Sequence, residues 1–179
     1  MFILIVGKAG SGKSTIAKYI SDKYHFKTFS LGDYVKKFLV ETSELLGNPI
    51  DIHDLYDINK KDKYRHQMQY IATELCRNYF GCNCWCKLLL EKIKQSKEIN
   101  VIIDDIRFIN EMIFFTKNQN DIITIKITKS IQMPNSCQND DLNHISETEL
   151  ERINCMYNII NNSTLDDLYK KIDDIMKNY

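Results

Sequence analysis

Short apolar runs alternate with longer amphipathic stretches along this chain, which is the pattern of strands alternating with helices. The apolar runs predict strands at 2–6, 26–29, 100–103, 122–127 and 157–160. The amphipathic stretches predict helices at 12–23, 32–46, 63–79, 83–97, 108–117 and 164–177. Such alternation is typical of an α/β domain, in which helices cover both faces of a mostly parallel sheet.

Two polar segments interrupt the alternation. Residues 47–62 contain Pro49 with several Asp and Asn residues, and we expect a loop there. Residues 129–144 contain Pro134 and many small polar residues, and they are too long for a plain connection. A functional lid is the usual reason for such a loop, so we predict a lid at about 129–146. We find no repeat and no second unit, which predicts a single domain over residues 1–179.

The composition is that of a soluble globular protein, with 44% apolar and 27% charged residues. Lys plus Arg equals Asp plus Glu at 24 each, so no overall field favours nucleic acid or a membrane as partner. The sequence has no apolar stretch of membrane-spanning length and no signal-peptide pattern. Six cysteines in a chain of this class indicate reduced thiols, and we expect a cytoplasmic protein.

Residues 7–14 read GKAGSGKS and stand between the first predicted strand and the first predicted helix. The spacing G-x-x-x-x-G-K-S in that context is the phosphate-binding P-loop. Its glycines let the backbone approach phosphate oxygens, and the next helix presents its positive end to a polyanion. Lys13 can reach the β- and γ-phosphates, and the Ser14 hydroxyl can ligate Mg²⁺. We therefore expect a nucleoside triphosphate to bind along Gly7, Lys8, Ala9, Gly10, Ser11, Gly12, Lys13, Ser14 and Thr15.

The predicted strand at 100–103 ends in Asp104 and Asp105, at the edge where an α/β sheet presents residues to ligands. A carboxylate there can hold the shell of a magnesium ion. The alternative is that Asp105 or Asn110 only caps the next helix. Arg107 offers a planar fork of donors to phosphate. The predicted metal ligands are Ser14, Asp104 and Asp105. The predicted catalytic residues are Lys13, Asp105 and Arg107.

The chain has only four arginine residues, and arginine is the residue that typically binds the phosphate of an acceptor. Arg65 and Arg77 lie twelve positions apart on one predicted helix and share roughly one face. Between them stand Gln69, Thr73 and Glu74, which could read a base or a sugar. The alternative is a solvated helix face with ion pairs between successive turns.

Three further polar segments can each be interpreted as functional or as structural. Asp33 and Lys36 open the helix after the second strand, either to hold an acceptor or because Ser30 or Asp33 caps that helix. His144 in the lid either contacts phosphate or lies at the surface. Residues 59–62 match the guanine-reading motif N-K-x-D, but no apolar strand precedes them, and we interpret the match as chance.

Taken together, these motifs resemble those of the deoxynucleoside monophosphate kinases of phages and large DNA viruses. The resemblance runs through six segments in one order along the chain. They are the P-loop, Gly32 to Lys36, Arg65 to Arg77 with Trp85 eight residues further, Asp105 to Glu111, His144 to Leu150, and Asn161 to Leu168.

This resemblance implies a P-loop kinase fold and transfer of a phosphoryl group from ATP, with Mg²⁺, to a deoxynucleoside monophosphate. It implies that the P-loop and Asn161 lie at the ATP, and it allows a homodimer. The implied acceptor-binding residues are Asp33, Lys36, Arg65, Gln69, Thr73, Glu74, Arg77, Trp85, Arg107, Glu111 and His144. The lid has no arginine before Arg152, so Lys129, His144 or a partner subunit would supply any lid charge.

Three other functions stay open at this point. A small-metabolite kinase of the phosphomevalonate kinase type shares a similar P-loop and D-x-R motif. A nucleotide-dependent switch is disfavoured because the sequence has no Asp-x-x-Gly. The third is a binding protein that retains the P-loop without turnover.

Overall fold

The computed structural model describes residues 1–57, 59–129 and 145–179. Its five strands form one sheet in the order β2-β3-β1-β4-β5, and every neighbouring pair is parallel. The strands are β1 (Phe2–Val6), β2 (Lys27–Phe29), β3 (Val101–Ile106), β4 (Ile122–Thr128) and β5 (Tyr157–Ile160). The predicted α/β class with a five-stranded parallel sheet is confirmed.

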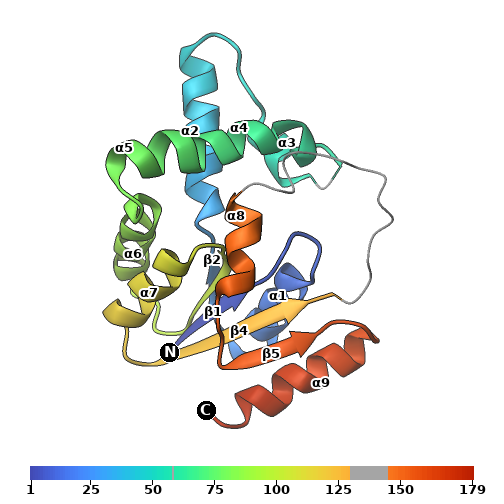
Figure 1. Ribbon diagram of the computed structural model, residues 1–179. Coiled ribbons are helices and arrows are strands. Elements are labelled where there is room, and N and C mark those ends of the chain that lie inside the picture. The colour runs from blue at the N-terminus through green and yellow to red at the C-terminus, as the bar shows by residue number, and fades with distance from the viewer. Residues whose placement is uncertain (58, 130–144) are drawn as a thin grey trace.

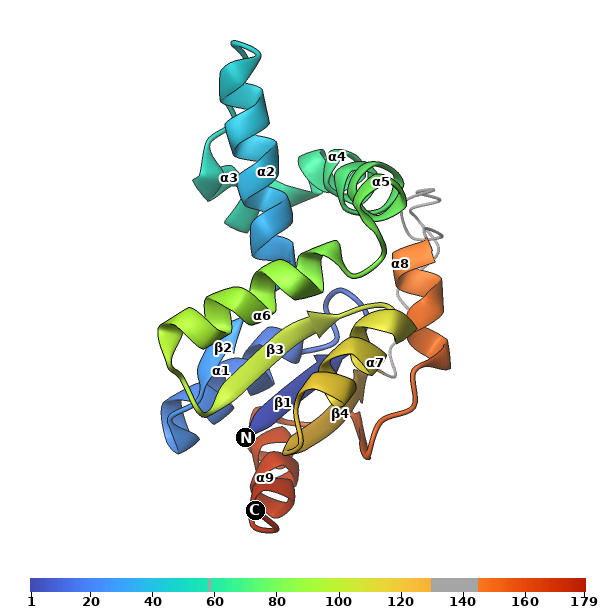
Figure 2. The ribbon, with the colours of Figure 1, turned by 90° about the vertical axis from the view of Figure 1, so that its left-hand side faces the viewer.

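Side chains alternate across the sheet and build a core on each face. Phe2, Leu4 and Val6 of β1 belong to one core, while Ile3 and Ile5 belong to the other. Helices α2 (Gly32–Leu45), α6 (Cys84–Ser96) and α7 (Ile109–Asn118) supply the first core. Helices α1 (Lys13–Tyr24) and α9 (Leu165–Met176) supply the second. Figure 2 shows the three layers that result.

A helical subassembly stands beyond the sheet, beside α2 (Figure 1). It comprises α3 (Ile52–Tyr56), the 3₁₀ helix η1 (Lys61–Tyr64), α4 (Arg65–Gln69), the π-helix η2 (Tyr70–Arg77) and α5 (Asn78–Phe80). The stretch predicted as helical at 63–79 is helical in the structure, but its interior is a π-helix instead of an α-helix. In a π-helix each N–H bonds to the carbonyl five residues earlier, whereas in an α-helix it bonds to the carbonyl four residues earlier. The side chains therefore do not repeat at the α-helical period on which the sequence prediction rests.

The loop prediction for 47–62 was wrong, because α3 and the start of η1 lie within it. The Asp51 side chain caps α3 by accepting a hydrogen bond from the His53 backbone N–H at 2.9 Å. Leu55 anchors the helix, and it is 1% exposed within the first core. A five-residue helix is too short to show a periodic pattern, so its stability comes from this burial.

Two short helices, α8 (Ile145–Thr148) and η4 (Glu149–Arg152), follow the segment predicted as a lid. Residues 130–144 of that segment, with His144, lie outside the described residues. Within the described ranges, no helix is both long enough and apolar enough to cross a membrane.

Candidate active site

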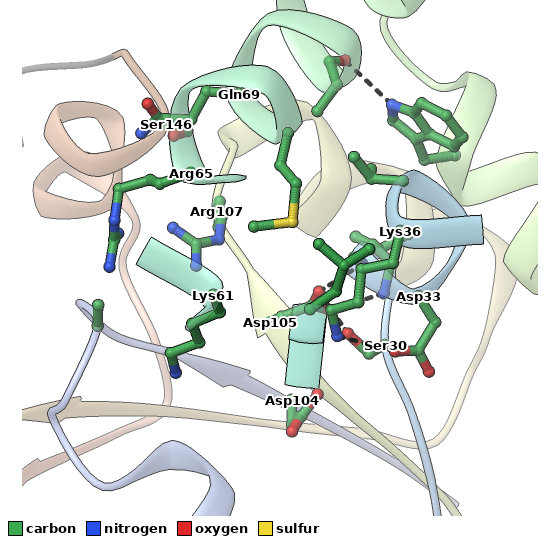
Figure 3. A pocket seen from close by; sticks show the side chains of 18 of the residues that line it. Ser30, Asp33, Lys36, Lys61, Arg65, Gln69, Asp104, Asp105, Arg107 and Ser146 are labelled. Carbon is green, nitrogen blue, oxygen red and sulfur yellow. Dashed lines mark hydrogen bonds and ion pairs between the residues drawn. The ribbon is translucent and has the colours of Figure 1, made fainter. Parts of the chain in front are cut away.

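A cavity of about 550 Å³ lies between the P-loop and the helical subassembly (Figure 3). Its volume falls in the usual range for a small-ligand site. Most of the predicted site residues line it, from segments that are far apart in the sequence. They are Ala9, Gly10, Lys13, Ser14, Asp33, Lys36, Arg65, Gln69, Thr73, Arg77, Trp85, Asp104, Asp105, Arg107 and Glu111.

The P-loop connects β1 directly to α1 and holds a left-handed backbone at two glycines. Gly10 has φ 74° and Gly12 has φ 107°, which side-chain-bearing residues rarely adopt. Gly7 is required for space, because a Cβ there would lie 2.5 Å from the Ile127 carbonyl oxygen. The Lys13 ammonium donates to the Lys8 carbonyl at 2.8 Å, so it lies folded over the loop that would surround a phosphate.

Asn161 braces the P-loop from the other end of the chain. Its side-chain amide donates to the Ser11 carbonyl at 2.9 Å, and its own N–H donates to the Thr128 carbonyl at 2.7 Å. The cavity lining includes neither Asn161 nor Gly7, Lys8, Ser11, Gly12, Thr15 and Glu74. The ATP contact predicted for Asn161 stays a prediction, and the visible role of this residue is to fix the loop.

A bulge in β3 brings both aspartates to the cavity. The pairing of β1 with β3 shifts between Leu4↔Ile103 and Val6↔Ile106, which places one extra residue in β3. Strict alternation would send neighbouring side chains to opposite faces, but both Asp104 and Asp105 line the cavity. The strand thus runs three residues beyond its predicted end at 103.

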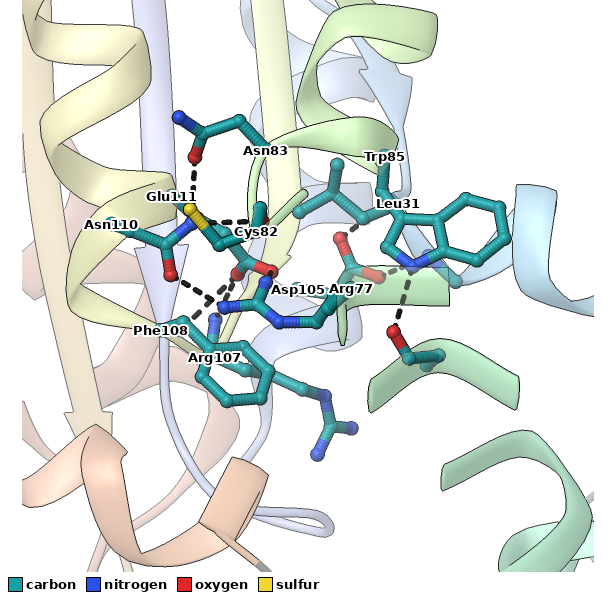
Figure 4. Close-up of polar contacts among 12 residues, drawn as sticks. Leu31, Arg77, Cys82, Asn83, Trp85, Asp105, Arg107, Phe108, Asn110 and Glu111 are labelled. Atoms are coloured by element: carbon teal, nitrogen blue, oxygen red, sulfur yellow. Dashed lines mark hydrogen bonds and ion pairs between the residues drawn. The ribbon is translucent and has the colours of Figure 1, made fainter. Parts of the chain in front are cut away.

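Asp105 is fully engaged in fixing the start of α2. Its carboxylate accepts from the Ser30 hydroxyl at 2.7 Å and from the backbone N–H groups of Leu31 and Gly32 at 2.8 and 2.7 Å. Both oxygens are therefore committed to the β2–α2 turn (Figure 4). This geometry argues against the predicted catalytic and metal-binding roles of Asp105, and it makes the residue a positioning group.

Asp104 remains the better-placed carboxylate for a cation. Burial, followed by the charges of Asp105 and Asp33, raises the pKa of Asp104 to about 7, and the nearby Lys13 charge opposes this shift. A carboxylate whose ionised form is disfavoured by its surroundings gains when a positive ligand arrives.

Arg77 and Glu111 form a buried ion pair, with Nη1 and Oε1 at 3.0 Å and side chains 9% and 5% exposed. Arg77 also donates to the Asn110 side chain at 2.6 Å and stacks on Phe108, with Cζ 3.7 Å from the ring centroid (Figure 4). Glu111 in turn accepts from the backbone N–H groups of Arg107 and Phe108, which caps α7. Burial raises the pKa of Glu111, while these backbone donors and Arg77 oppose the shift.

Arg77 and Glu111 were predicted to bind the acceptor, but in the structure their side chains are engaged with each other and with α7. Both side chains are already satisfied by each other and by α7, in a pair that is almost closed to solvent. The geometry favours a structural role, in which the pair holds Arg107 and the start of α7 in place.

Part of the cavity lining is apolar. Its apolar lining consists of Leu31, Val35, Leu55, Met68, Ala72 and Trp85. The Trp85 indole N–H donates to the Ala72 carbonyl at 3.0 Å, which fixes the ring plane. Gln69 and Thr73 line the same cavity from the neighbouring helical turns.

Sequence reasoning missed several lining residues, among them Ser30, Tyr56, Lys61, Asp62 and Ser146. Tyr56 donates its hydroxyl to Asp33 at 2.8 Å, and the Lys36 ammonium lies 3.7 Å from the Tyr56 ring centroid. Lys36 also pairs with Asp33 at 3.2 Å. Asp33 and Lys36 are thus brought together as predicted, but the residue that joins them comes from α3, where no motif pointed.

The family described as deoxynucleotide monophosphate kinase matches residues 51–172, which is more than half of the chain. No curated protein matches significantly.

Solved structures, kinases among them, share the fold at low sequence identity. TT1252 from Thermus thermophilus has a TM-score of 0.57 and 16% identity, covering 99% of this chain and 97% of its own. Dephospho-CoA kinase from Campylobacter jejuni has a TM-score of 0.55 and 15% identity, covering 98% and 95%. Shikimate kinase from Aquifex aeolicus has a TM-score of 0.50 and 16% identity, covering 99% and 97%. At such identities the likeness shows the fold, which is that of P-loop kinases.

The family match carries the classification further than the fold alone. It makes the protein a phosphotransferase, and kinase chemistry implies ATP as the phosphoryl donor. The resemblance seen in the sequence motifs is confirmed: the chain belongs to the deoxynucleotide monophosphate kinase family.

Proposed function

We propose that the protein transfers the γ-phosphoryl group of ATP to the phosphate of a deoxynucleoside monophosphate, which yields ADP and a deoxynucleoside diphosphate. The observation that carries this proposal is the set of side chains that line one cavity. The lining combines P-loop residues, several cationic side chains, and apolar residues that include Trp85. A nucleotide, with an anionic phosphate and an apolar base, matches this combination of surfaces.

At the donor end, the P-loop N–H groups and Lys13 hold the triphosphate. The loop follows a strand and precedes a helix, so successive N–H groups and the helix terminus face the same anion. Lys13 begins α1 and lines the cavity, where it can exchange its bond to the Lys8 carbonyl for phosphate oxygens.

The residues at the junction also fit a magnesium ion. Mg²⁺ is typically held by one or two protein oxygens together with substrate phosphates and water. Ser14 and Asp104 line the cavity and supply that kind of donor, and the surroundings of Asp104 raise the pKa of its carboxyl. When bound, the ion would neutralise charge on the donor phosphates.

At the acceptor end, a base would lie against Trp85 and the apolar residues around it, with Gln69 and Thr73 at its polar edge. The monophosphate would then point back toward Lys36, Arg65 and Arg107. Because the acceptor oxygen is already anionic, no strong general base is needed. The residues act by positioning two polyanions in line and by reducing their repulsion.

The test is ADP formation from ATP and Mg²⁺ with dTMP, dGMP, dCMP, dAMP, their ribose counterparts and phosphomevalonate, each against a control without acceptor. Turnover that requires one or more deoxynucleoside monophosphates would support the proposal and name the acceptor. Turnover only with phosphomevalonate would refute it in favour of a small-metabolite kinase. ATP binding without turnover on any acceptor would leave a binding protein.

A further inference from the structure

Lys60, which precedes the 3₁₀ helix η1, and Lys61, the first residue of η1, have different surroundings. The Lys60 ammonium pairs with Asp54 at 2.7 Å, which ties it to α3 on the exposed side. Lys61 is half-buried and lines the cavity. The turn itself is fixed, since the backbone N–H groups of Lys60 and Lys61 both donate to the Asp57 carbonyl. Lys61 is therefore held toward the site by the same turn that points Lys60 away.

Among the described residues, Lys61 also differs from Lys36, Arg65 and Arg77 in having no counter-charge. Lys36 pairs with Asp33, Arg65 pairs with Asp62 at 2.7 Å, and Arg77 pairs with Glu111. Among the residues that the structure describes, the Lys61 side chain has neither a hydrogen bond nor an ion pair. An ammonium group that is partly withdrawn from water without a partner is unfavourable, and an anionic ligand removes that cost.

Figure 3 shows where this charge is directed. Lys61, Arg65 and Arg107 come from three different elements and point into the same part of the cavity. Arg65 lies in α4, one residue beyond η1, and Arg107 lies between β3 and α7. Three cations that converge in a cavity shared with a P-loop match a phosphoryl group more closely than they match a base or a sugar.

We propose that Lys61 is a further catalytic residue, which contacts the phosphoryl group as it passes between donor and acceptor. This inference rests on the proposed kinase function. In the transfer, the bond from the γ-phosphorus to the β-bridging oxygen breaks, and a bond from that phosphorus to an acceptor phosphate oxygen forms. Lys61 keeps its proton and donates hydrogen bonds to the equatorial oxygens. Lys61 would thus supply a cation from the acceptor side, whereas the predicted lid has no arginine before Arg152.

The experiment compares Lys61→Met with Lys60→Met, because the two lysines are adjacent and only Lys61 lines the cavity. With the preferred acceptor, kcat for Lys61→Met should fall by about 10²-fold, the usual loss when one preorganised donor is removed. Lys60→Met should stay within about twofold, because its exposed ion pair contributes little. Lys61→Arg should recover part of the loss, since it restores the charge. Equal kcat values for the two methionine variants would overturn the proposal.

A binding measurement separates failure of this inference from failure of the proposed function. Inorganic tripolyphosphate needs no acceptor, and Trp85, the single tryptophan, lines the cavity and can report its binding by fluorescence. We expect the Kd for tripolyphosphate to rise about tenfold in Lys61→Met and to stay unchanged in Lys60→Met. If the wild-type protein phosphorylates no deoxynucleotide, the proposed function fails, while this difference in Kd still supports Lys61 as a phosphate ligand. Equal Kd values in both variants would overturn it.

Discussion

Replacing Arg77 by Met should destabilise the fold strongly, because it leaves the Glu111 carboxylate buried without its cation. The two side chains are 9% and 5% exposed, so water cannot take the place of the lost partner. Removing one member of a buried ion pair typically costs about 3–5 kcal/mol. In a domain of this size, 1 kcal/mol corresponds to about 2–4 °C, so the melting temperature should fall by roughly 6–20 °C.

The matched control is Lys94→Met, which removes a surface ion pair with Glu91. That pair has similar distances, but its side chains are 60% and 63% exposed. Exposed pairs are worth about 0–1 kcal/mol, so this variant should melt close to the wild type. The double variant Arg77→Met with Glu111→Gln should recover part of the loss, because the buried charge is removed while the amide can still cap α7.

The assay is thermal unfolding followed by Trp85 fluorescence, together with KM for the acceptor that the wild type prefers. If Arg77→Met proved as stable as Lys94→Met while KM rose strongly, the structural reading of this pair would be refuted. Arg77 would then have the acceptor-binding role that its sequence position predicted.

Three further predictions concern the P-loop, the aspartate pair and the rear of the sheet. Lys13→Ala should lower kcat by about 10²–10³-fold without a matching loss of melting temperature, and near-normal turnover would contradict its role at the donor phosphates. Asp104→Asn should raise the Mg²⁺ concentration needed for half-maximal rate. Asp105→Asn should lower stability and leave that concentration unchanged. If Asp105→Asn raised the required Mg²⁺ concentration and Asp104→Asn did not, Asp105 would be the ligand. The Lys23 ammonium, helped by the hydroxyls of Tyr24 and Tyr19, lowers the pKa of Asp173 from 3.8 to about 2. The stabilisation that the Asp173 carboxylate provides is therefore present above about pH 4 and lost as pH falls through about 2. The stability difference between wild type and Asp173→Asn should shrink over that range, and a constant difference would contradict this prediction.

Much of the fold could be predicted from local patterns. The strands β1 and β5 were predicted with the bounds that the structure has, and α1, α2, α6, α7 and α9 differ from prediction by at most one residue at either end. These elements carry either an unbroken apolar run or a clear amphipathic period, and both signals are local. The P-loop could also be predicted from the sequence, because its glycines, lysine and serine lie within eight consecutive residues.

The roles of individual charged side chains could not be read in this way. Asp105 and Arg77 stand at motif positions, yet one braces the β2–α2 turn and the other pairs with Glu111, 34 residues away. Sequence spacing indicates that a polar group is present, but not which partner takes up its hydrogen-bonding capacity.

The sequence by itself therefore determined the class of fold, the P-loop between β1 and α1, and the family. Those features depend on residues that are close together in the chain, where periodicity and short motifs carry the physical information. Only the tertiary structure decided which cations are neutralised and which face the cavity. That distinction arises when α3 packs against α2 and η1 packs against α3, so that Lys61 lines the cavity while Lys60 pairs with Asp54. Burial and counter-charges are properties of the packed molecule, so no local pattern could have separated two adjacent lysines.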